Sequence, residues 1–78
     1  MDERELMKWA VKGLSAEIER LDGKIRKGRE YVRRIDAGEP VKTSASRESI
    51  IGTIRESSEE MERLDKERSE LRWKLDVE

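Results

Sequence analysis

The chain contains no cysteine, no histidine and no phenylalanine, and it has a single proline among its 78 residues. Without cysteine there is no disulfide and no thiolate metal site. Without histidine the chain lacks the usual general base and the commonest metal ligand. No apolar run approaches the ~20 residues that a membrane-spanning helix requires. These absences predict a protein without cofactor, metal, membrane or small-molecule substrate.

Charged residues make up 47% of the chain and hydrophobic residues 33%, but the charges nearly cancel to a net −1. High charge combined with regularly spaced apolar residues is typical of coiled coils and long helices, whereas disordered chains lack the period. The first residues, MDERELMKW, are acidic and lack the apolar stretch of a secretory signal. We therefore expect one small, soluble, cytoplasmic domain that spans residues 1–78.

One stretch, AGEPVKTSAS, has the composition of a loop. Gly38 is predicted to lie just past the C-terminus of the first helix, a position that glycine favours, and Pro40 follows shortly after it. Ser44 or Ser46 can cap the next helix, because a serine oxygen accepts a hydrogen bond from an unpaired backbone N–H. The sequence predicts one helix over about 3–37, a loop over about 38–46 and a second helix over about 47–76.

Apolar residues recur at alternating steps of three and four along both predicted helices, which is the pattern of a coiled-coil seam. The first series is Met7, Val11, Leu14, Ile18, Leu21, Ile25, Gly28, Val32 and Ile35. The second series is Ile50, Ile54, Ser57, Met61, Leu64, Arg68, Leu71 and Leu75. Arg68 interrupts the second seam, and we expect its stem to pack while its head reaches solvent or a carboxylate such as Glu17. A buried polar residue that sets the register is the alternative.

The two seams fit one another in an antiparallel pairing, because facing residue numbers sum to a constant. The pairs Met7 with Leu75, Val11 with Leu71, Ile18 with Leu64, Leu21 with Met61, Ile25 with Ser57, Gly28 with Ile54, and Val32 with Ile50 all share that sum. The fold prediction is an all-α, antiparallel two-helix coiled-coil hairpin. We further expect it to pair into a dimeric four-helix arrangement, although a domain-swapped dimer would preserve the same pairings.

Outside the seam, the predicted open end of the hairpin carries a second set of apolar residues. Tryptophan is enriched at interaction hot spots, and both tryptophans fall at outward heptad positions. The alternative is that each is a partly exposed ring lying over aliphatic neighbours. The candidate protein-interaction residues are Leu6, Trp9, Gly13 and Ala16 on one helix, and Trp73 and Val77 on the other. Near the loop, Tyr31 and Ile51 flank the seam, where a widened core is expected rather than a ligand pocket.

The segment KIRKGREYVRR raises the alternative of nucleic-acid binding. Its charges spread around the helix, and we expect the acidic segment ESSEEMERLDKE of the facing helix to neutralise them in part. A duplex-binding surface needs a one-sided positive face. Candidate contacts to nucleic acid or to an acidic partner are Arg26, Lys27, Arg29, Arg33, Arg34, Lys42 and Arg47.

The carboxylates of such helices project into water, where nothing raises a pKa for acid catalysis. The predicted function is therefore a non-enzymatic protein–protein interaction module. It would act as an adaptor, an assembly factor or a small inhibitor such as a phage-type anti-CRISPR, through self-association as a homodimer or through a larger protein partner. Weak nucleic-acid binding and a role as a structural spacer are the alternatives.

Overall fold

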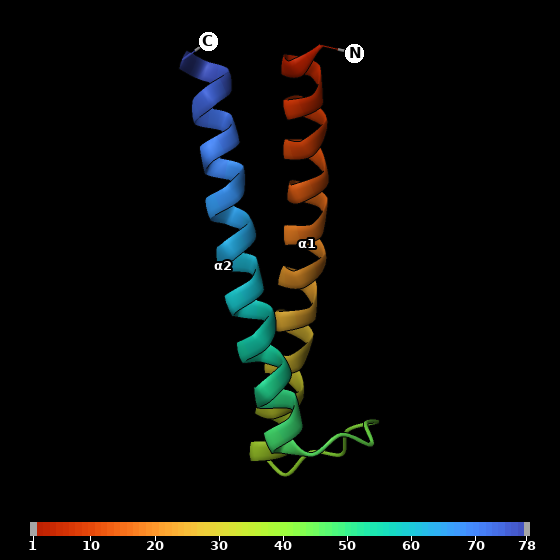
Figure 1. Ribbon diagram of the computed structural model, residues 1–78. Coiled ribbons are helices and arrows are strands. Elements are labelled where there is room, and N and C mark those ends of the chain that lie inside the picture. Colours follow the sequence, from red (N-terminus) through yellow and green to blue (C-terminus); the bar gives the residue numbers. More distant parts are fainter. Residues whose placement is uncertain (1, 78) are drawn as a thin grey trace.

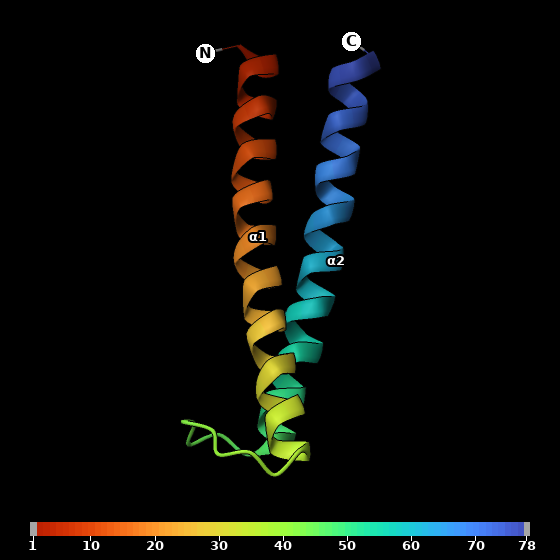
Figure 2. The same ribbon diagram turned by 180° about the vertical axis from the view of Figure 1, so that it is seen from behind.

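The computed structural model describes residues 2–77. It contains two α-helices, α1 over Glu3–Asp36 and α2 over Arg47–Val77, which pack against each other as an antiparallel hairpin. The molecule is a rod with extents of 54 × 17 × 15 Å. Both described chain ends lie at one end of the rod, and the connecting loop lies at the other (Figures 1 and 2). We call these the open end and the loop end.

Helix α1 begins and ends where side-chain and backbone hydrogen bonds replace the missing helical ones. The Asp2 carboxylate accepts from the Glu5 backbone N–H at 2.8 Å, as an N-cap residue does. At the other end Gly38 has φ 74°, in the left-handed region that glycine tolerates best. The Gly38 N–H donates to the Ile35 carbonyl at 3.1 Å, and the Glu39 N–H donates to the Arg34 carbonyl at 2.9 Å. This pair of bonds is the Schellman motif.

Helix α2 is capped by Ser46, whose hydroxyl oxygen accepts from the Ser49 backbone N–H at 3.1 Å. Of the two predicted cap residues, Ser44 and Ser46, it is therefore Ser46 that caps α2. The first helix ends one residue earlier than predicted, and the second extends one residue further. Arg47 also joins the two helices across the loop, because its guanidinium lies 2.7 Å from the Asp36 carboxylate.

The predicted register is confirmed by the contact between Gly28 and Ile54. A Cβ atom placed on Gly28 would lie 2.8 Å from Ile54 Cγ1, so the two predicted partners touch directly. The buried residues of the interface are Leu21, Ile25, Ile50, Ser57 and Leu64. Each of them belongs to one of the predicted pairs, and the small Ser57 faces the bulky Ile25, as interdigitated packing requires.

Burial is uneven along the rod. The buried residues lie in the middle and toward the loop end, whereas the seam residues of the open end are only half-buried. These half-buried residues are Met7, Val11, Leu14, Leu71 and Leu75. The open end therefore has no buried seam residue within residues 2–77, although Val32, Ile35 and Ile54 near the loop are only partly covered as well.

Candidate protein-interaction surfaces

The large apolar side chains that face solvent within residues 2–77 all lie at the open end. Trp9 is 60% exposed and Trp73 is 65% exposed. Leu6 and Val77 are also more than half exposed. The sequence analysis chose these four residues because they lie outside the heptad seam, and the structure leaves all four uncovered. Their role in binding stays a prediction.

Trp9 lies on an outer face of α1 between two lysines. The Lys12 Nζ lies 5.3 Å from the centroid of the Trp9 ring, within cation–π range. Lys8, Trp9 and Lys12 line a shallow hollow. Gly13 and Ala16, which the sequence grouped with Trp9, are also exposed, and a Cβ on Gly13 would meet nothing within 4 Å. This face therefore has room for a closely approaching chain.

Trp73 occupies a similar setting on α2. It lines a shallow hollow together with Lys66, Ser69, Glu70 and Lys74. Every residue of this hollow comes from α2, and every residue of the Trp9 hollow comes from α1. The two tryptophans therefore form two separate surfaces, each an aromatic ring bordered by two lysines.

Arg68 interrupts the seam close to these surfaces. Its guanidinium donates to the Ser15 hydroxyl of α1 at 3.2 Å and forms an ion pair with Asp65 at 2.8 Å. Its Nε is buried without a hydrogen-bond partner among the described residues. The guanidinium therefore reaches a carboxylate, as expected, but that carboxylate belongs to Asp65 and not to Glu17, which pairs with Arg20 on its own helix. Asp65 is three residues from Arg68 on the same helix, a spacing at which side chains meet readily.

The basic segment of α1 is largely matched by acids of the same helix. Arg26 pairs with Asp22 at 3.0 Å, and Glu30 accepts from both Arg33 and Arg34. Hydrogen bonds from Arg33 and then Arg34 lower the pKa of Glu30 to about 2. The expected neutralisation by the facing helix was wrong in its source: the ion pairs seen here run within α1, apart from Arg47 with Asp36.

Of the remaining basic candidates, Lys27 lies over the Tyr31 ring, with its Nζ 5.9 Å from the ring centroid. Arg29 and Lys42 are exposed. The seven candidates therefore do not form one uninterrupted positive face, because acids lie between them.

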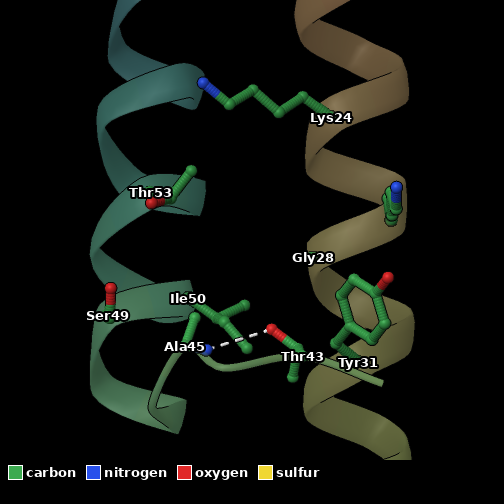
Figure 3. A pocket seen from close by; sticks show the side chains of 9 residues that line it. Lys24, Gly28, Tyr31, Thr43, Ala45, Ser49, Ile50 and Thr53 are labelled. Carbon is green, nitrogen blue, oxygen red and sulfur yellow. Dashed lines mark hydrogen bonds between the residues drawn. The ribbon is translucent and has the colours of Figure 1, made fainter. Parts of the chain in front are cut away.

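A hollow of about 230 Å³ opens at the loop end, where a widened core was expected. Tyr31 lines this hollow instead of filling the core. The other lining residues are Lys24, Lys27, Gly28, Thr43, Ala45, Ser49, Ile50 and Thr53, from both helices and the loop (Figure 3). Sequence reasoning missed most of these residues. The available signal was Gly28, a seam residue without a side chain that stands three positions before the aromatic Tyr31.

Two further features bear on the kind of site. Within residues 2–77 no group of three or more aspartate or glutamate side chains is arranged to hold a metal ion. Neither described helix has a stretch long and apolar enough to cross a membrane. Comparison with protein-family models, with curated proteins and with solved structures found no match to this chain.

Proposed function

We propose that this chain is a non-enzymatic protein–protein interaction module whose first partner is a second copy of itself. The observation that carries the proposal is the open end, where Trp9 and Trp73 are exposed beside a half-buried seam. Burying an aromatic ring together with half-covered aliphatic residues is the main source of affinity in most interfaces. The open end offers both, with the tryptophans on two separate outer faces and the aliphatic residues in the seam between the helices.

The hairpin alone has a small core, since only four apolar side chains are buried within residues 2–77. Domains of this size rarely gain enough stability from one core, and oligomerisation is a common remedy. A second hairpin laid against the open end would cover the seam and produce a four-helix arrangement. Adaptor, assembly-factor and inhibitor roles would use the faces that remain free.

The nucleic-acid alternative has less support. Arg26, Arg33, Arg34 and Arg47 already form ion pairs with acids of the chain, so binding a phosphate would require those pairs to break. The lysines beside the two tryptophans instead favour a protein surface with acidic residues around an apolar patch.

The test is the solution molar mass, measured by light scattering after size exclusion over protein concentrations from micromolar to millimolar. We expect a concentration-dependent dimer, and Trp9→Ala with Trp73→Ala should weaken it by about 2 kcal/mol per tryptophan. Glu59→Ala, an exposed position that lines neither tryptophan hollow, is the matched control and should leave the dimer intact. Helicity measured by circular dichroism checks that each variant still folds.

A wild-type chain that stays monomeric at millimolar concentration would contradict self-association. The open-end faces would then be candidates for a larger protein partner. A ladder of large assemblies would indicate a structural spacer instead.

A further inference from the structure

The loop-end hollow has a chemical character different from that of the tryptophan faces. Lys24 and Lys27 come from α1, Thr43 comes from the loop, and Ser49 and Thr53 come from α2. Figure 3 shows the Lys24 side chain extending from α1 toward α2 above Thr53. With the phenol of Tyr31, the lining therefore has two ammonium groups and four hydroxyls, and it includes no carboxylate.

The lysines of the hollow are available for a ligand. Neither Lys24 nor Lys27 forms an ion pair among the interactions described for residues 2–77, in contrast to most arginines of α1. Lys27 is held over the Tyr31 ring. The Thr43 hydroxyl oxygen accepts from the Ala45 N–H at 3.2 Å, and its own hydrogen remains able to donate. All of these groups favour a negatively charged acceptor.

The floor of the hollow is apolar, and Gly28 forms part of it. Ile54 and Ile50 pack closely against the Gly28 backbone, so the floor is made of tightly packed apolar atoms. Ile50 is buried at the floor, and Ala45 and the Tyr31 ring border it. The volume of about 230 Å³ is below the ~300 Å³ at which pockets for drug-sized ligands begin. A single side chain with a short aliphatic stem matches this space better than a nucleotide.

From these features we infer that the loop-end hollow binds a carboxylate side chain presented by a partner protein. The stem of that side chain lies over Gly28 and Ile50, and its carboxylate meets Lys24, Lys27 and the hydroxyls. A nucleic-acid backbone is disfavoured because Glu48 is next to the lining residue Ser49 and Glu56 lies one helical turn beyond the lining residue Thr53. Successive phosphates would meet those acids, whereas one carboxylate would not.

The experiment is an NMR titration of the full chain, with acetyl-leucyl-glutamate amide as the probe and its glutamine counterpart as the neutral control. We expect the glutamate probe to give saturable shifts at the Gly28, Thr43 and Thr53 amides, with millimolar affinity that falls as salt is raised. Lys24→Gln with Lys27→Gln should weaken binding about fivefold, as expected for exposed charge pairs. Lys66→Gln, beside Trp73, is the matched control and should not change it.

Equal binding of the glutamate and glutamine probes, or no saturable shift at the hollow, would overturn the proposal. Tighter binding of inorganic phosphate or of a thymidine oligonucleotide at the same amides would also overturn it, in favour of a phosphate site. The result is separable from the open-end proposal, because Trp9→Ala with Trp73→Ala should leave this titration unchanged. Lys24 and Lys27 are exposed, so their substitution should not prevent folding.

Discussion

Gly28 has no Cβ atom, and this absence sets the distance between the helices at the loop end. Glycine lowers the stability of a helix interior by about 1 kcal/mol relative to alanine. Its place in the seam is explained by Ile54, whose Cγ1 and Cδ1 atoms lie 2.8 and 3.1 Å from the position that a Cβ would take. Gly28 also lines the loop-end hollow, so it contributes both to the packing of the helices and to the candidate ligand site.

Gly28→Ala should therefore destabilise the hairpin although alanine is the better helix former. Overpacking costs about 1–3 kcal/mol, against a helix-propensity gain of about 1 kcal/mol. We expect a net loss of about 1 kcal/mol in the free energy of unfolding, measured by urea denaturation. Gly23→Ala is the matched control, because a Cβ there meets nothing within 4 Å, and it should stabilise the chain.

Measuring Gly28→Ala in an Ile54→Ala background separates steric crowding against Ile54 from other causes of a change in the free energy of unfolding. Once the isoleucine is shortened, Gly28→Ala should become stabilising by about 1 kcal/mol. The explanation would be wrong if Gly28→Ala destabilised equally in both backgrounds, or if it stabilised the wild-type chain.

Arg68 is a residue whose contacts could be predicted from the sequence only in part. The interruption of the seam was visible in the heptad pattern, and the packing of the arginine stem followed from its position. Its carboxylate partner did not follow, since Glu17 was the example expected and Asp65 was not considered. The structure favours Asp65 on the same helix, where the spacing holds the pair together, while Arg20 occupies Glu17.

At the scale of the elements, the helix ends were the most predictable part of the fold. Gly38 and the serines near residue 46 mark the stop and the start because their backbone chemistry is local. The choice between Ser44 and Ser46 was open, because a cap depends on where the chain turns into the helix. The contact between Gly28 and Ile54 confirms the register that the numerical pairing of the seams predicted.

The two serines make a matched pair for testing the cap. Ser46→Ala should lower the free energy of unfolding by about 1 kcal/mol, because the Ser49 N–H loses its acceptor. Ser44→Ala should change it by less than about 0.5 kcal/mol, as for most exposed substitutions. Thermal denaturation followed by circular dichroism measures both. Equal effects of the two substitutions would contradict the assignment of Ser46 as the cap.

At the scale of the whole molecule, the two seams are continuous in sequence but unequally buried. The sequence could not predict this inequality, because the heptad pattern treats each layer alike. It also could not predict the loop-end hollow, which arises from the combination of Gly28, the loop and the first turns of α2. Tertiary packing decides which residues cover a side chain, whereas the heptad pattern predicts only the helix face on which that side chain lies.

Uneven burial predicts uneven protection of backbone amides from hydrogen exchange. At low protein concentration, amides near Gly28 should exchange about tenfold more slowly than amides near Val11, although the two residues lie equally far from the ends of α1. Raising the protein concentration should slow exchange at the open end if the chain self-associates there. Equal protection at Gly28 and Val11 in dilute solution would contradict the inferred stability gradient.

The same gradient gives the hairpin a mechanical property. The buried layers toward the loop hold the two helices together, and the helices extend from these layers along a molecule 54 Å long. A change of a few degrees in the crossing angle is amplified along the helices, so it moves the chain ends far more than the loop. The separation of Trp9 and Trp73 would therefore change more with the crossing angle than the separation of residues beside the loop.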